Sequence, residues 1–130
     1  MFRRLVPLIF ATVLVSCEQA PQAIQPGPNV QRETQRALIT AKPGDTVRFA
    51  AGVFEFSKTL SLDVENVTVS GVGPDKTIMK FRDQVTGTGG EGLLVTKGGF
   101  TLQDLAIEDS QGDAVKVTGV DGVTFRNVRV

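Results

Sequence analysis

The second half of the chain repeats itself every 22 to 23 residues, and this repeat constrains the fold more than any other feature. Residues 100–107 match residues 123–130 position by position, at a spacing of 23 residues. Upstream of these, residues 91–95 match residues 113–117 at a spacing of 22. Repeated units of this length stack on their neighbours in sequence order, so the repeat predicts a solenoid.

Each repeat carries short runs in which apolar and polar residues alternate, and glycine separates the runs. Such runs predict β-strands of three to five residues, and nothing after Thr46 has the period of a helix. A repeat of this length without a helix suits a coil of three short strands. We therefore expect an all-β fold, a right-handed single-stranded parallel β-helix of about four coils, with successive coils ~4.8 Å apart.

Stacking of the coils predicts which residues lie above one another. We expect Val67, Phe100 and Val123 to form a ladder inside the coil, and Thr68, Thr101 and Thr124 to form one outside. Each of these runs follows a residue that tolerates a turn: Asn66, Gly99 or Gly122. The interval of 33 residues from Val67 to Phe100 exceeds one period, and the excess falls in the Gly-rich stretch 82–92, which we interpret as an inserted loop.

A short helix is expected before the first strand. Asn29 is a suitable N-cap for a helix over residues 30–41, and Pro43 and Gly44 end it. Its apolar face is placed to cover the open first coil, which would otherwise expose unpaired backbone groups. Helix and coils then form one domain over residues 30–130.

The N-terminus has the pattern of an export signal. Two arginines precede an apolar run over residues 5–15 that is too short to span a bilayer. Leu14, Ser16 and Cys17 resemble the end of a bacterial lipoprotein signal; the alternative is an incidental cysteine. We expect a signal peptide over residues 1–16, lipidation of Cys17, a location in the bacterial cell envelope and a flexible, Pro-containing tether over residues 17–29.

Composition excludes several classes of site. The 14 basic and 14 acidic residues balance and are scattered, so no nucleic-acid partner is expected. The chain has no histidine, which excludes a His-dependent triad or a His metal ligand from this stretch. A single cysteine cannot form an internal disulfide or a multi-cysteine metal site.

Carboxylates and basic side chains are therefore the candidates for chemistry. Glu91 and Asp113 occupy matched positions one coil apart, a spacing similar to the ~5 Å carboxylate pair of a retaining glycosidase. The competing and preferred interpretation is that both are solvated turn residues. Asp109 and Asp113 are candidate calcium ligands, and no other cofactor is evident.

Lys116, Arg126 and Arg129 point outward by alternation. They are candidates to bind an acidic sugar or to act as a base, and surface solubility explains them equally well. Lys116 is expected to stack over Leu94 of the coil below, so no ladder of basic residues forms.

The motifs of the first coils resemble two groups of known proteins. The opening resembles right-handed, pectate-lyase-like β-helix proteins, and the stretch 37–130 is similar to a bacterial family of exported parallel β-helix repeat proteins. The motifs that carry these resemblances are Ala37, Leu38, Ala41, 43–47, 51–54, 71–73, 77–78, 91–95 and 112–117. The second resemblance implies a fold and an export route, a lipoprotein signal, and a cytochrome-like or uncharacterised exported partner. It implies no reaction.

Three functions follow as hypotheses. The first is a lipid-anchored scaffold whose outer surface binds polysaccharide or an envelope protein. The second is a polysaccharide lyase, epimerase or hydrolase with active coils beyond residue 130, and the third is an accessory subunit of an exported redox partner. Because Val130 lies inside an expected strand with no cap after it, we interpret the chain as an N-terminal fragment.

Overall fold

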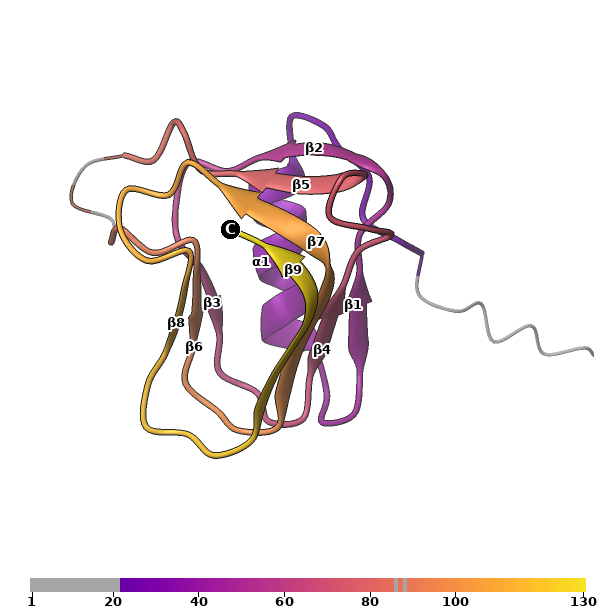
Figure 1. The fold of residues 1–130 in the computed structure, drawn as a ribbon, viewed down its shortest axis with the longest axis vertical. Coiled ribbons are helices and arrows are strands. Elements are labelled where there is room, and N and C mark those ends of the chain that lie inside the picture. Colours follow the sequence, from indigo (N-terminus) through magenta and orange to yellow (C-terminus); the bar gives the residue numbers. More distant parts are fainter. Residues whose placement is uncertain (1–21, 86, 88) are drawn as a thin grey trace, which may run out of the picture.

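The chain coils into a parallel β-solenoid of about three turns, with one short helix, α1, at its N-terminal end (Figure 1). The computed structural model describes residues 22–85, 87 and 89–130. The expected signal peptide over residues 1–16, the lipidated Cys17 and the first part of the tether lie outside the described residues.

The elements follow the order expected for a helix and then short strands. They are α1 (Val30–Thr40), β1 (Thr46–Arg48), β2 (Gly52–Glu55), β3 (Leu60–Leu62), β4 (Thr68–Ser70), β5 (Thr77–Lys80), β6 (Leu93–Val95), β7 (Phe100–Glu108), β8 (Val115–Val117) and β9 (Val123–Arg129).

The strands stack on three faces, and every pair between them is parallel. Face A contains β1, β4, the first half of β7 and the first half of β9. Face B contains β2, β5, the second half of β7 and the end of β9. Face C contains β3, β6 and β8. In Figure 1 the chain runs counterclockwise from β1 to β3 while it advances from α1 toward the viewer, which makes the coil right-handed.

The register confirms the ladders expected on face A. Thr68 pairs with Thr101, and Thr101 pairs with Thr124. On the inner side Phe100 pairs with Val123, and Val67 and Phe100 are fully buried. On face C, Lys116 lies next to Leu94 as expected. The structure has about three turns rather than four, because β9 is the only strand of a further turn among the described residues.

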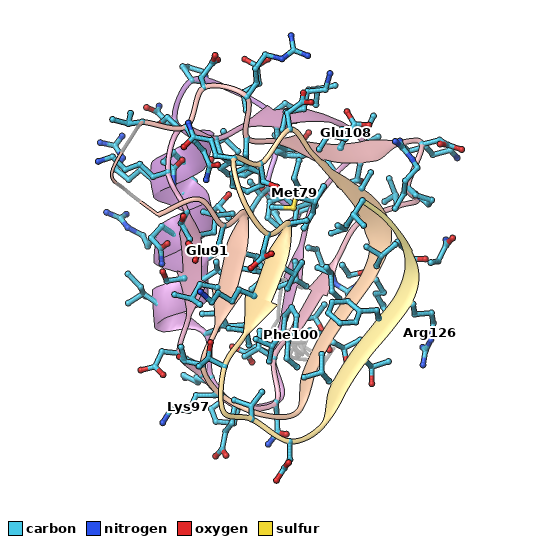
Figure 2. All side chains as sticks on the ribbon, turned by 60° about the vertical axis from the view of Figure 1, so that its left-hand side comes forward. Met79, Glu91, Lys97, Phe100, Glu108 and Arg126 are labelled. Atoms are coloured by element: carbon cyan, nitrogen blue, oxygen red, sulfur yellow. The ribbon has the colours of Figure 1, made fainter. Side chains whose placement is uncertain are left out.

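Phenylalanine rings fill much of the interior. Phe56 and Phe81 lie on adjacent turns and stack with their ring centroids 5.1 Å apart, and Phe49 and Phe54 make an edge contact at 5.2 Å. Figure 2 shows Met79 and Phe100 inside the coil. Among the described residues no further turn covers the inward-facing side chains of β9, and Phe125 is therefore 53% exposed.

Stacked residues with a left-handed backbone conformation form the corner before face A. Gly44, Asn66, Gly99 and Gly122 occupy this corner in successive turns, and all four have positive φ angles, from 56° to 94°. Glycine and asparagine tolerate this conformation better than other residues, which explains why the sequence places them there. At Gly99 a side chain would also collide with the Asn66 amide oxygen of the turn below.

Two segments close the open side of the first turn: the stretch around Ile24 and the helix α1. On face A, Ile24 forms a parallel bridge with Phe49: its N–H donates to Arg48 O at 2.8 Å, and its carbonyl accepts from Ala50 N at 2.9 Å. Residues from Ile24 onward thus belong to the folded domain, which begins before the boundary at Val30 predicted from the sequence. A single bridge inside a Pro-containing stretch leaves no periodic pattern that would reveal it.

Beneath face C, two glutamines of α1 pair with the exposed edge of the chain. Ser61 N donates to Gln35 Oε1 at 2.9 Å, and Gln35 Nε2 donates to Ser61 O at 2.9 Å. One helical turn earlier, Gln31 Oε1 accepts from the N–H groups of Ser57 and Lys58 at 3.0 and 3.1 Å. The other side of α1 buries Thr34 and Leu38 against the interior. Asn29 stands at the N-cap position, but its side chain makes no capping hydrogen bond.

The insertion between β5 and β6 is tied to the turns around it. Gln84 is buried, and its side chain donates to Glu91 O at 2.7 Å and accepts from Gln111 N at 2.9 Å. The Gln111 side chain returns a hydrogen bond to Gln84 O at 2.8 Å. The side chains of Gln84 and Gln111 therefore anchor the extra residues of the second turn to the turn above.

The corner ladder generates a prediction about Gly99. Gly99→Ala should lower the free energy of unfolding by at least about 2 kcal/mol, because alanine is strained at positive φ and its Cβ meets Asn66. Gly119→Ala is the matched control, since Gly119 also has a positive φ but open space around it. It should cost about 1 kcal/mol. Denaturant unfolding measures both, and equal losses would contradict the stacked-corner account.

Candidate functional site

The candidate residues lie on the outside of the solenoid. Figure 2 shows Glu91, Glu108 and Arg126 pointing away from the interior, on different parts of the surface. Arg126 lies in β9 on face A, whereas Lys116 lies in β8 on face C and Glu91 precedes β6. The structure therefore does not bring all the candidates together.

Glu91 and Lys116 form an ion pair between adjacent turns. Lys116 Nζ lies 3.3 Å from Glu91 Oε1, and the carboxylate side chain is 20% exposed. The Glu91 main-chain N–H, followed by the Lys116 ammonium, lowers the pKa of the Glu91 carboxyl below its ordinary value of 4.5. A general acid working near neutral pH requires a raised pKa, so the surroundings of Glu91 favour a charged structural carboxylate.

Asp113 is exposed and lies on the turn above Glu91. Its main-chain carbonyl accepts a hydrogen bond from Gly92 N at 2.9 Å, which is the stacking expected from the repeat. Asp109 pairs with Arg82 of the insertion, with Arg82 Nη2 3.2 Å from Asp109 Oδ2. Among the described residues no group of three or more acidic, histidine or cysteine side chains is placed to hold a metal ion. Asp109 and Asp113 therefore do not belong to a group of three or more potential metal ligands among these residues.

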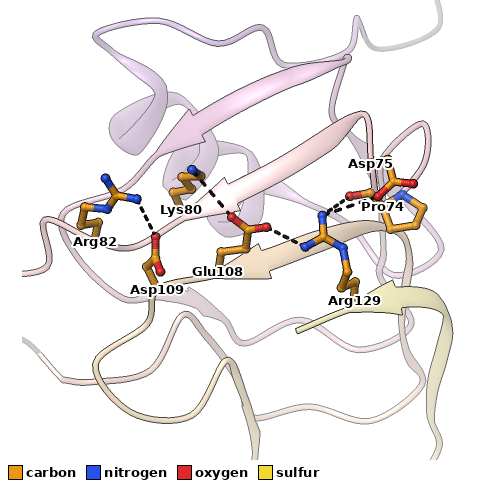
Figure 3. Close-up of polar contacts among 7 residues, drawn as sticks. All are labelled: Pro74, Asp75, Lys80, Arg82, Glu108, Asp109 and Arg129. Atoms are coloured by element: carbon orange, nitrogen blue, oxygen red, sulfur yellow. Dashed lines mark hydrogen bonds and ion pairs between the residues drawn. The ribbon is translucent and has the colours of Figure 1, made fainter.

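Sequence reasoning missed a charge cluster on face B, drawn in Figure 3. Glu108 accepts from Arg129 Nη1 at 2.7 Å and lies 3.7 Å from Lys80 Nζ. Arg129 also donates to Pro74 O at 3.0 Å and lies 3.7 Å from Asp75 Oδ1. Arg129, expected to point outward, also ties the last turn to the two turns below it. The outward alternation of Lys80, Glu108 and Arg129 was the available signal, but the spacing between β5 and β7 on this face is 28 residues and differs from the repeat.

The outer surface of face A carries an ordered polar array. One column consists of the in-register threonines Thr46, Thr68, Thr101 and Thr124. A parallel column consists of Arg48, Ser70, Gln103 and Arg126. We call these two columns the polar array.

The two arginines stand at opposite ends of the polar array, three strand spacings or about 14 Å apart. Between them Gln103 Nε2 donates to Ser70 Oγ at 3.2 Å. Neither Arg48 nor Arg126 forms an ion pair with a residue that the structure describes. Both cations are therefore available to an anionic group outside the chain.

Comparison with protein-family models, curated proteins and solved structures gave no match for this chain. The fold thus stands on the geometry of the chain itself. Within the part of the chain that the structure describes, α1 is the only helix, and no helix has the length and apolar character needed to cross a bilayer.

The Glu91 ion pair generates a pH prediction. A carboxyl whose pKa is lowered on folding stabilises the protein above its unfolded pKa, and this stabilisation disappears as the pH falls through the folded pKa. Glu91→Gln should therefore lower the melting temperature at pH 7, and the difference from the unsubstituted protein should shrink steadily below pH 4.5. Glu65→Gln is the control, because Glu65 is exposed and has no ion pair among the described residues. A Glu91→Gln difference that stays constant from pH 7 to pH 3 would refute the pairing.

Proposed function

We propose that this chain belongs to an exported, lipid-anchored β-helix protein of the bacterial cell envelope that binds polysaccharide on the polar array of face A. The observation that carries the binding proposal is the in-register stacking of threonines beside a column that ends in two arginines, neither of which has an ion pair within the described ranges. Solenoids commonly use such extended surfaces for binding.

The chemistry of the polar array suits a chain of acidic sugars. Hydroxyl and amide groups such as Thr101 and Gln103 can both donate and accept hydrogen bonds, as sugar hydroxyls require. Arg48 and Arg126 offer planar donor groups that match carboxylates in a bidentate manner. Because the two arginines lie three strand spacings apart along the array, an extended polymer with carboxylates at intervals is a better ligand than a single sugar.

Envelope location follows from the N-terminal pattern, which ends at Leu14, Ser16 and Cys17. Acylation of Cys17 would supply enough hydrocarbon for stable anchoring. The resemblance to exported, pectate-lyase-like β-helix proteins is part of the same proposal. The parallel solenoid and its single N-terminal helix support it at the level of the fold.

The proposal is tested in two arms on the full chain, beginning with the anchor. The unsubstituted protein should incorporate a labelled fatty acid and fractionate with membranes, and Cys17→Ala should abolish the label. Absence of the label from the unsubstituted protein would contradict the anchor without affecting the binding arm.

The binding arm measures retention on immobilised polysaccharides. The protein should be retained on a polyuronate more strongly than on an uncharged glucan, and Arg48→Gln with Arg126→Gln should weaken retention about tenfold or more, because each lost charge-assisted contact is worth roughly 1 kcal/mol or above. Lys97→Gln is the control for loss of a positive charge, since Lys97 is exposed in the corner between β6 and β7 and belongs to neither column of the polar array. Retention that is insensitive to both arginines would overturn the site. Shortening of the polymer or formation of unsaturated sugars would favour a lyase or hydrolase instead.

A further inference from the structure

An open groove runs along the outer side of α1, at the capped end of the solenoid. It has a volume of about 690 Å³, and its lining includes Arg32, Arg36, Ile39, Lys58 and Thr59. Three of these five side chains are cationic, and none of the groove's lining residues is acidic. We call this surface the cap groove.

The cap groove combines positive charge with exposed apolar surface. Arg32, Arg36 and Ile39 follow one another at intervals of four and three residues, which places them on one stripe of the helix. This stripe lies opposite Thr34 and Leu38, the residues that α1 buries against the first turn. Ile39 is 69% exposed at the end of the stripe.

The cations of the cap groove have no acidic partner among the residues that the structure describes. Arg32, Arg36 and Lys58 form no ion pair with any residue in the described ranges, although other basic residues such as Lys80 and Arg129 do. Arg32 makes one long contact of 3.4 Å to Asn29 Oδ1. The groove is thus a site of uncompensated positive charge, with Glu33 to the side of the stripe as the nearest acid in the helix.

Hydrogen bonds between the Gln31 side chain and the Lys58 main chain fix the shape of the groove. The N–H of Lys58 donates to Gln31 Oε1 at 3.1 Å, and the Lys58 carbonyl accepts from Gln31 Nε2 at 3.4 Å. The loop that carries Lys58 is therefore fixed against the helix that carries the arginines. The three cations are presented on one preformed surface.

The short stretch of chain between Cys17 and Ile24 limits how far the capped end of the solenoid can lie from the proposed anchor. Ile24 is fixed by its bridge to Phe49, and it follows Cys17 by only seven positions in the sequence. Seven residues reach at most about 25 Å when fully extended. A lipid on Cys17 would hold the capped end of the solenoid close to the bilayer surface.

We propose that the cap groove is a membrane-contact surface, in which Arg32, Arg36 and Lys58 bind anionic lipid headgroups and Ile39 enters the interface. Cations next to an exposed aliphatic side chain match the layered chemistry of a bilayer surface, with phosphate outside and hydrocarbon beneath. The contact orients the solenoid on its capped end and leaves the polar array exposed. This inference rests on the proposed anchor for its proximity argument.

The absence of tryptophan from the chain provides a direct test, because Ile39→Trp introduces a single indole as a probe. The full chain is inserted into vesicles that carry bromine-labelled acyl chains, which quench an indole only at close approach. With phosphatidylglycerol in the vesicles, the probe at position 39 should be quenched, and Val72→Trp should not be. Val72 is 53% exposed but lies between β4 and β5, away from α1.

The cations are then removed one at a time. In the Ile39→Trp background, Arg36→Gln or Lys58→Gln should each reduce the equilibrium constant for contact about fivefold, and added salt should reduce it further. Lys97→Gln should leave quenching unchanged. Equal quenching in purely zwitterionic vesicles, or none in anionic ones, would overturn the proposal. A spectral change with a soluble polyanion but not with vesicles would also overturn it and would assign the groove to a polymer.

Vesicle flotation, recorded on the same samples, separates this proposal from the anchor. Loss of flotation would contradict acylation of Cys17. The chain with Cys17→Ala should still show quenching that depends on anionic lipid, at a higher lipid concentration, because the groove itself is unchanged. Its failure to do so while the acylated chain still floats would refute the groove and leave the anchor intact.

Discussion

A parallel solenoid aims its backbone N–H and C=O groups along its axis, so each turn depends on the next for its hydrogen bonds, and the first turn has no neighbour below it. Here the missing neighbour is supplied by two different devices. Ile24 provides a short piece of strand under face A, and Gln31 and Gln35 provide side-chain amides under face C. A side-chain amide carries one acceptor and two donor hydrogens, so it can replace a peptide group of the absent turn. The helix then covers the apolar interior with Leu38.

Faces A and C were predictable from the sequence, whereas on face B only the last strand pair, β7 with β9, was predictable. Thr101 and Thr124 are one period apart, as are Leu94 and Lys116, so the repeat alone predicted their pairing, which the register confirms. On face B the partner of Ile78 lies 28 residues later, at Ala106, because the insertion and the corners change the interval. The Lys80–Glu108 contact depends on that register and could not be derived from a period of 22 or 23, whereas Arg129 lies next to Ala106 at an interval of 23. The bridge at Ile24 was missed for a related reason, since a single paired residue has no period.

The charged candidates divide into paired and unpaired groups once the turns are stacked. Glu91 and Asp109, singled out by the sequence for chemistry, are each occupied by a basic partner from a neighbouring turn. Such exposed pairs contribute modestly to stability and bring no unusual reactivity. Among the described residues, five of the cations without an ion pair lie in two places: Arg48 and Arg126 at the ends of the polar array, and Arg32, Arg36 and Lys58 in the cap groove. This grouping depends on side-chain pairing between stacked turns, which the sequence pattern alone does not contain.

Hydrogen exchange at the amides of Ser57 and Ser61 tests the capping account most directly. Both groups lie at the open edge of the first turn and are held only by the glutamine side chains of α1. We predict that both are protected in the unsubstituted protein, that Gln35→Ala removes protection at Ser61 alone, and that Gln31→Ala removes it at Ser57 alone. Unchanged protection at both serines in both variants would show that something other than the glutamines closes the first turn.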